Sequence, residues 1–238
     1  MIRRPPRSTL DRSSAASDVY KRQEMAEAKE NERLAKAGFS GPLFKTNAFL
    51  DAHPFGTVPA AFGPDGTVGI FESNSIMRAV GRLGQEVYPL YGKDPYAASR
   101  IDSFLDASLV FARDSQIYLL ALMAGTVTPE VHARAKEAFA TYLTGIDRAL
   151  MPSRSHLVGD SITLADICFV AEYALFSNER AQRKLLEGQG LEPVLNEGVG
   201  HEYARALNHF EVMSEHEAFA EDVAPYMEKL ERRIERAA

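Results

Sequence analysis

The residue types that most often carry covalent or metal chemistry are scarce in this chain of 238 residues. Cys168 is the only cysteine, so an internal disulfide and zinc sites built on several cysteines are excluded. It lies in the mostly apolar run 167–175, which favours a small core residue over a reactive thiol. His209 and His216 are seven residues apart, but the sequence indicates a new helix start between them. Because no third ligand accompanies them, no metal site is predicted.

Thr163 and Asp166 form the sharpest local motif in the second half of the chain. Thr163 is expected at the N-cap of a helix, where its side chain accepts a hydrogen bond from the Asp166 amide. The Asp166 carboxylate in turn accepts from the Thr163 amide. Ile162 and Ile167 occupy the hydrophobic-staple positions around this capping box. Since capping already explains the carboxylate, we assign Thr163 and Asp166 a structural role and no catalytic one.

A strand–turn–strand–helix pattern lies between residues 58 and 83. Two short apolar runs, Val58 to Phe62 and Thr67 to Phe71, flank the turn residues 63–66 (Gly-Pro-Asp-Gly), which predicts a β-hairpin. Ser73 follows the second run directly and is a good N-cap for a helix over 74–83. The hairpin therefore leads straight into a helix that begins with a hydroxyl group.

The elements before this hairpin are expected to be short. Residues 24–37 are predicted to form a charged helix that stops at Gly38, and Phe39 to Lys45 is expected to be a loop. Residues 46–52 are predicted to form a short helix with Asn47 near its start.

From about residue 95 onward the pattern is helical. Residues from Ile101 to Ala112, apolar except for Ser108, recur at offsets of 3, 4, 7, 8 and 11, which places them on one face of a long helix. A second stripe runs from Val131 to Leu150 and predicts an antiparallel partner. Further helices are expected near 163–178, 201–213 and 222–237. The chain thus has a small α/β front part and an all-α back part.

The composition excludes several broad classes of protein. Apolar residues make up 45% and charged residues 25%, as in an ordinary globular protein. The longest uninterrupted apolar stretch, 117–124, is far short of the roughly 20 residues that span a bilayer. The net charge of -6 disfavours a protein that coats nucleic acid.

Residues 1–23 differ in composition from the rest of the chain. They hold six basic and two acidic residues, two adjacent prolines and scattered serines, with no apolar period. Three interpretations are open: an organelle transit peptide, a disordered tail, or a translated sequencing adapter, which the wording of the segment resembles. We favour the third, which implies that the native sequence starts near Glu24 and has lost its own beginning.

Three motifs in order resemble the cytosolic glutathione S-transferase superfamily: Gly-Thr-Val-Pro at 56–59, Phe-Glu-Ser-Asn-Ser-Ile at 71–76, and Leu-Val-Gly-Asp-Ser-Ile-Thr-Leu-Ala-Asp at 157–166. The match covers about residues 45–238, and the wording is most similar to bacterial and plant-type enzymes and to the gamma subunit of translation elongation factor one. The resemblance implies an α+β two-domain fold. A thioredoxin-like domain lacking its first strand would span 24–86, and an all-helical domain would span 95–238.

The resemblance implies a glutathione site on the front domain. Val58, followed by a cis Pro59, would pair with the cysteinyl backbone of glutathione. Ser73 and the start of its helix would hold the γ-glutamyl carboxylate, and Glu72 would face the ligand's amino group. Lys45 matches a basic position that faces the glycyl carboxylate. For each residue a purely structural or solvent-exposed role is the alternative.

The implied reaction is addition of the glutathione thiol to a small electrophile, with glutathione as cosubstrate and no cofactor or metal. No catalytic residue can be named, because the family's thiol-activating Tyr, Ser or Cys lies near the first strand; Tyr20 and Ser40 are weak candidates. Little conjugating activity is therefore expected of the chain as it stands. The alternative is a non-catalytic assembly module like the elongation-factor gamma subunit. The resemblance also implies a cytoplasmic homodimer. From the net charge and the short apolar stretches, neither nucleic acid nor a membrane is expected as a partner.

Overall fold

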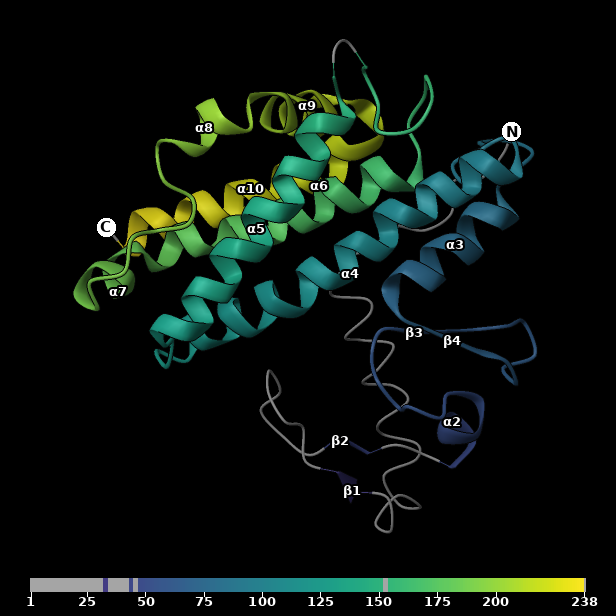
Figure 1. Ribbon diagram of the computed structural model, residues 1–238. Coiled ribbons are helices and arrows are strands. Elements are labelled where there is room, and N and C mark those ends of the chain that lie inside the picture. Colours follow the sequence, from purple (N-terminus) through teal and green to yellow (C-terminus); the bar gives the residue numbers. More distant parts are fainter. Residues whose placement is uncertain (1–31, 34–42, 45–46, 152–153, 238) are drawn as a thin grey trace. The chain divides into compact units, whose positions relative to one another are not determined.

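The chain divides into two compact units, Met1–Ile76 and Met77–Ala238, here called the front unit and the helical unit. Figure 1 shows the computed structural model. It describes residues 32–33, 43–44, 47–151 and 154–237. The boundary between the units falls inside a helix, whereas the sequence analysis placed it in the loop that follows that helix.

The first described elements are two short paired strands. β1 (Glu32–Arg33) pairs antiparallel with β2 (Leu43–Phe44). The helix predicted over 24–37 is therefore wrong at Glu32 and Arg33, and the loop predicted over 39–45 contains a strand. Pairing between segments separated along the chain overrides the local helix propensity, which is only a weak guide. The rest of both segments, and the segment 1–23, lie outside the described residues.

The short helix and the hairpin predicted after residue 46 are both present. α2 spans Asn47–Ala52, β3 spans Ala60–Phe62 and β4 spans Gly69–Phe71. The strands are shorter than the apolar runs because their outer residues belong to the turn and the preceding loop. α2 ends directly over β4, since a Cβ atom built on Gly69 would collide with the carbonyl of Ala52. Only glycine at position 69 permits this approach.

The next helix, α3 (Ser73–Leu83), begins one residue earlier than expected. Its last two turns belong to the helical unit. There Gly81 faces Leu164, whose Cδ1 lies 3.2 Å from the place where a Cβ would stand. The small residue therefore lets α3 lie close to the start of α6.

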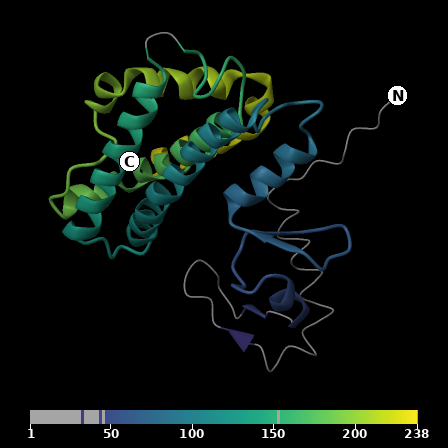
Figure 2. The same cartoon turned by 45° about the vertical axis from the view of Figure 1, so that its right-hand side comes forward.

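The helical unit is built from the helices that the apolar periodicity predicts. Figures 1 and 2 show α4 and α5 as the two long neighbouring helices of this unit. Three shorter elements, η2, α7 and α8, were not predicted, because they are too short to show a period. The helices are α4 (Pro95–Met123), α5 (Pro129–Ala149), α6 (Leu164–Phe176), η2 (Ser177–Gln182), α7 (Arg183–Gly188), α8 (Val199–Glu202), α9 (Ala204–Glu215) and α10 (Glu217–Ala237).

Aromatic side chains fill the centre of the helical unit. Phe111 of α4 stacks on Tyr142 of α5 with ring centroids 4.7 Å apart, and Phe139 stacks on Phe176 at the same separation. Tyr118 is fully buried. Burial of such side chains is the main source of stability in a helix bundle.

The capping box at the start of α6 is present as predicted. Asp166 is fully buried, and its carboxylate accepts from the amide and hydroxyl of Thr163, from the Leu157 amide and from His209. Burial alone would raise the pKa of Asp166, but these hydrogen bonds outweigh burial and hold its pKa below the usual range. The carboxylate is thus a structural group that joins the start of α6 to α9.

Two further buried carboxylates tie distant segments together. Glu179 accepts from the Tyr118 hydroxyl at 2.6 Å and from the amides of Val194 and Leu195 at 2.9 and 2.7 Å. Asp147 accepts from the amides of Arg205 and Ala206, the first turn of α9. Neither set of hydrogen bonds was predicted, because each joins residues that are far apart in the sequence.

Among the described residues, no helix is both long enough and apolar enough to cross a membrane.

Candidate functional site

The hairpin brings the four described site residues to one end of the β3–β4 ladder. Ala60 pairs with Phe71, Ala61 with Ile70 and Phe62 with Gly69. Val58 and Pro59 directly precede Ala60, and Glu72 and Ser73 directly follow Phe71. The two pairs that sequence analysis singled out are therefore neighbours across the hairpin.

The tight turn at the other end fixes this register. The amide of Gly66 donates to the Gly63 carbonyl at 2.9 Å, and the Thr67 amide donates to the Asp65 carboxylate at 3.1 Å. Gly66 has φ 75°, a left-handed conformation that favours glycine. A slip by one residue would turn every strand side chain to the opposite face, so the turn chemistry determines which residues meet at the site.

Val58 and Pro59 lie in an exposed bend before β3. The peptide bond between them is cis, as expected. Both residues are exposed, and Val58 keeps 65% of its full accessibility. Their surface is available to a ligand that runs along the end of the hairpin.

Glu72 makes the change of direction from β4 to α3. It is the one residue other than glycine in the described part of the chain with a positive φ, 67°. Such a conformation is uncommon for a residue with a Cβ and marks a tight connection. Ser73 follows as the first residue of α3, and both side chains are exposed. The start of α3 thus lies beside an exposed carboxylate and an exposed hydroxyl.

A buried histidine supports the loop that carries Val58. The His53 ring is fully buried, stacks on Phe71 with ring centroids 4.8 Å apart, and contacts the Thr57 hydroxyl at 3.3 Å. Phe49 and Phe55 add further ring contacts with this pair. Sequence analysis did not identify His53, because its stacking on Phe71 joins residues that are distant along the chain, which local spacing does not reveal.

The remaining predicted chemistry does not come together within the described residues. Lys45, Tyr20 and Ser40 lie outside them. Cys168 is buried and donates to the Ser108 hydroxyl at 3.0 Å. Burial raises the pKa of its thiol to about 12, so it is not a nucleophile at neutral pH. No group of three or more His, Cys, Asp or Glu residues in the described part of the chain is placed to hold a metal ion.

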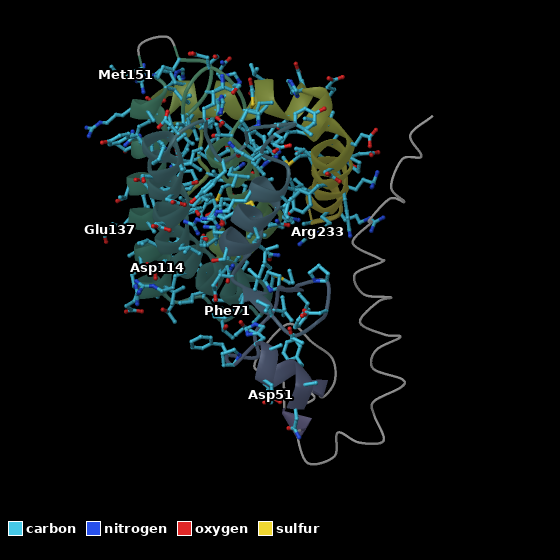
Figure 3. The ribbon with its side chains drawn as sticks, turned by 90° about the vertical axis from the view of Figure 1, so that its right-hand side faces the viewer. Asp51, Phe71, Asp114, Glu137, Met151 and Arg233 are labelled. Atoms are coloured by element: carbon cyan, nitrogen blue, oxygen red, sulfur yellow. The ribbon has the colours of Figure 1, made fainter. Side chains whose placement is uncertain are left out.

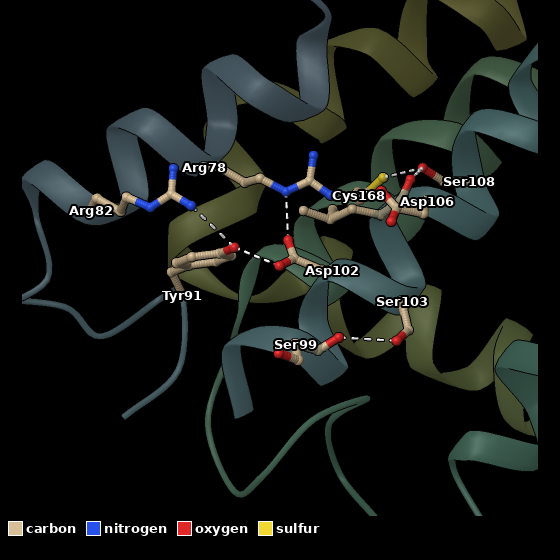
Figure 4. A network of polar contacts seen from close by, with 10 residues as sticks. Arg78, Arg82, Tyr91, Ser99, Asp102, Ser103, Asp106, Ser108 and Cys168 are labelled. Atoms are coloured by element: carbon tan, nitrogen blue, oxygen red, sulfur yellow. Dashed lines mark hydrogen bonds and ion pairs between the residues drawn. The ribbon is translucent and has the colours of Figure 1, made fainter. Parts of the chain in front are cut away.

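A polar network fixes the last turns of α3 within the helical unit. Figure 4 shows the Arg78 guanidinium between Asp102 and Asp106 of α4, and it bonds Asp106 at 2.7 Å. The Tyr91 hydroxyl donates to the second oxygen of Asp102 at 2.7 Å, and Arg82 lies over the Tyr91 ring. Burial raises the pKa of the Tyr91 hydroxyl and its bond to Asp102 raises it further, which keeps this donor protonated. The network holds α3 on α4 by directional bonds.

The chain is similar in sequence to known proteins of two kinds. No protein-family model matches the chain. It is 34% identical over 144 residues to a probable elongation factor 1-gamma of Arabidopsis thaliana, which covers 57% of this chain and 32% of that protein. It is 31% identical over 131 residues to a glutathione S-transferase-like protein of Gibberella moniliformis, with 53% and 58% covered. The chain thus spans about a third of the length of the elongation-factor relatives it matches.

Solved structures give the same fold at low sequence identity. A glutathione transferase F7 of Populus trichocarpa matches with a TM-score of 0.55 at 19% identity, over 76% of this chain and 80% of that one. A glutathione S-transferase of Methylobacterium radiotolerans, crystallised with glutathione sulfonate, matches with a TM-score of 0.54 at 19% identity, over 75% and 76%. At such identity the likeness establishes the fold.

Proposed function

We propose that this chain, which has the fold of the glutathione S-transferases, binds glutathione at the end of the β3–β4 hairpin and serves in its conjugation to an electrophile. One observation carries the proposal: the register Ala60 to Phe71 sets an exposed backbone bend beside the open start of α3. The fold likeness and the similarity to a glutathione S-transferase-like protein support it.

Glutathione is an extended, anionic tripeptide, and the site offers a complement to each of its features. The γ-glutamyl carboxylate suits the first amides of α3, where the helix dipole favours an anion, with the Ser73 hydroxyl as an added donor. The Glu72 carboxylate suits the ligand's α-amino group. The cysteinyl backbone can pair along Val58, and Lys45 is proposed for the glycyl carboxylate. Pro59 shapes the bend.

The conjugation step requires a thiolate. A free thiol has a pKa of about 8.5, so only about 3% is ionised at pH 7. Lowering that pKa by two units takes about 2.7 kcal/mol of differential stabilisation. The hydroxyl groups near the candidate site include those of Ser73 and Thr57, and we assign the activating role to neither. The reaction class is therefore proposed from the fold and the relatives.

A second candidate is a non-catalytic assembly module. The specific observation in its favour is the similarity to elongation factor 1-gamma of several organisms, among them rice at 35% identity over 136 residues. In this interpretation the fold serves to hold other subunits, and any glutathione site is unused.

Binding is tested by titrating the full chain with glutathione in a calorimeter, as wild type, Ser73→Ala and Glu72→Gln. Loss of one hydrogen bond to a charged group should weaken binding about tenfold for each variant. Ser75→Ala is the matched control, because it also removes a serine hydroxyl from the first turn of α3. Ser75 directly follows the buried Asn74. If wild type does not bind, or if both site variants bind as tightly as wild type, the proposed site is wrong.

Turnover separates the two candidates. The rate of conjugation of glutathione with 1-chloro-2,4-dinitrobenzene, above the uncatalysed rate, would support the enzyme. Because little conjugation is expected of the chain as it stands, glutathione binding without turnover is compatible with either candidate. Absence of glutathione binding would favour the assembly module.

A further inference from the structure

A small hollow lies on the helical unit where the end of α3, the loop 84–94 and the first turn of α4 meet. It encloses about 280 Å³ and is open to solvent. All of its lining residues lie between positions 82 and 98, so it belongs wholly to the helical unit. They include two basic residues, Arg82 and Lys93, and the acid Asp94. Here the hollow is called the α3–α4 pocket.

Hydrogen bonds and one glycine fix the loop that forms a wall of this pocket. The Gln85 side-chain amide donates to the Gly92 carbonyl, and the Leu164 amide of α6 donates to the Leu90 carbonyl at 2.9 Å. Gly92 has φ 85°, and a Cβ atom built on it would lie 2.9 Å from the Ala98 amide nitrogen. Glycine therefore lets the loop return closely onto α4. The pocket is thus largely formed before a ligand binds.

The Arg82 guanidinium is held in place by Tyr91. It lies over the Tyr91 ring, 4.7 Å from the ring centroid, and its Nη2 donates to the Tyr91 hydroxyl at 3.3 Å (Figure 4). The hydroxyl in turn donates to Asp102 at 2.7 Å, so the ring is itself fixed. A guanidinium stacked in this way keeps most of its N–H groups for another acceptor, and its planar fork suits the oxygens of a carboxylate or a phosphate.

The two cations of the pocket are not neutralised. Neither Arg82 nor Lys93 forms an ion pair with any residue that the structure describes. By contrast, Arg78 lies between two carboxylates, and Arg233, labelled in Figure 3, donates to the Asn178 side chain at 2.7 Å. Unpaired cations in a concave surface favour an anionic ligand.

The acid that lines the pocket is already used as a helix cap. The Asp94 carboxylate accepts from the amides of Tyr96 and Ala97, at 2.8 and 2.9 Å, in the first turn of α4. The start of the helix opposes its negative charge, and these amides are not offered to a ligand. The positive charges of Arg82 and Lys93 therefore dominate the pocket, in a chain whose net charge is -6.

We propose that the α3–α4 pocket binds a phosphate monoester group, with the fork of Arg82 and the ammonium of Lys93 on its oxygens. A phosphate monoester carries nearly two negative charges at neutral pH, which matches the two cations. The volume of about 280 Å³ lies just below the usual range for small-molecule pockets, about 300–1,000 Å³, so it suits a phosphate with a short carbon chain. A small metabolite and a phosphorylated side chain both carry this group. The site does not depend on the function proposed above.

The first test is a titration of the ¹⁵N-labelled full chain with methyl phosphate, followed by amide chemical shifts. We expect saturable shifts of the Gly92 and Lys93 amides, while the amides of Val58 and Ser73 stay in place. No saturable shift of the pocket amides at tens of millimolar methyl phosphate would overturn the proposal.

Charge variants show whether the two cations bind the phosphate. Arg82→Gln should weaken binding about tenfold, because it removes a bidentate charged donor. Lys93→Gln should weaken it about threefold, the effect of one exposed ion pair. Arg100→Gln is the matched control, because Arg100 also lies over an aromatic ring, that of Phe104 at 4.9 Å, and does not line the pocket. Losses in both pocket variants no greater than that of the control would contradict the assignment.

A comparison of probes identifies the group that is bound. Methyl sulfate resembles methyl phosphate in shape but carries a single charge, so at pH 7.5 it should bind about threefold more weakly. Equal affinities would mean that the pocket takes any small anion, and phosphate would then be the wrong assignment. Glycerol 2-phosphate and N-acetyl-O-phosphoserine amide distinguish the two sources, since the tighter of the two indicates a metabolite or a phosphorylated side chain. If both bind more weakly than methyl sulfate, the proposal is wrong.

Discussion

The front unit and the helical unit differ in where their polar side chains lie. In the helical unit the carboxylates of Asp166 and Glu179 are buried and hydrogen-bonded, with Glu172 as an exception. Among residues 47–76 of the front unit only His53, Gly56 and Asn74 are buried, and the candidate site residues are exposed. One unit thus uses carboxylates for stability, whereas in the other the Glu72 carboxylate is exposed, as the proposed glutathione site requires.

The largest effect is expected from Glu179→Ala in the helical unit. It would leave the Tyr118 hydroxyl and the amides of Val194 and Leu195 without their acceptor. Because these donors are buried or nearly so, the free energy of unfolding should fall by about 4 kcal/mol. Urea denaturation followed by circular dichroism measures it. Glu187→Ala, at an exposed residue, is the control and should change stability little. Equal losses of stability in the two variants would show that the hydrogen bonds of Glu179 contribute little.

The next effect is expected in the front unit, from Gly69→Ala. The added methyl group would collide with the backbone carbonyl of Ala52, so β4 and α2 must separate. We expect a loss of about 3 kcal/mol for the cooperative step that includes the hairpin. Because the hairpin carries the candidate site, glutathione affinity should fall with it. A variant with wild-type affinity and stability would mean that α2 does not pack on β4.

A pH effect is expected from Glu172 of α6. One of its carboxylate oxygens is buried without a hydrogen-bond partner among the described residues, and burial raises its pKa to about 7. The folded state thus holds a proton that the unfolded chain, with a pKa near 4.5, releases. This contribution to stability is complete below pH 4.5 and is lost as the pH rises through 7.

Denaturation of wild type and Glu172→Gln across pH 4 to 8 tests this account. The variant should gain about 3 kcal/mol relative to wild type between the two ends of that range, since glutamine has no proton to lose. A difference between the two proteins that does not vary with pH would show that Glu172 is solvated in the folded state.

The smallest effect is a gain. Gly145→Ala adds a methyl group to α5 where nothing lies within 4 Å, so it should stabilise the helical unit by up to about 1 kcal/mol. Thermal unfolding measures the shift. Gly69→Ala and Gly145→Ala are the same substitution, but the first should lower stability and the second should raise it. A loss of stability in Gly145→Ala would mean that another part of the chain packs against residue 145.

Local patterns predicted much of this fold. The turn residues 63–66 determined the hairpin, the 3.6-residue period gave α4 and α5, and Thr163 with Asp166 gave the start of α6. Each of these depends on residues within one or two turns of each other. The hairpin in turn placed Val58 to Pro59 beside Glu72 to Ser73, so most of the candidate site followed from a local argument.

What sequence reasoning missed depends on residues that meet only in the folded chain. The strand at Glu32 pairs with Phe44, which local helix propensity does not reveal. Glu179 meets Tyr118 across 61 residues, and Asp147 meets Arg205 across 58. His53 became part of the site's support through stacking on Phe71. Such contacts arise from tertiary packing, and a single sequence carries no period or spacing that marks them.

The central claim is that glutathione binds at the end of the β3–β4 hairpin. The most direct measurement is a titration of the ¹⁵N-labelled chain with glutathione, followed by amide chemical shifts. The account predicts saturable shifts of the amides of Val58, Ser73 and Asn74, while the amides of Val110 and Glu179 in the helical unit stay in place. Saturable shifts confined to the helical unit, or no shifts at millimolar glutathione, would contradict it.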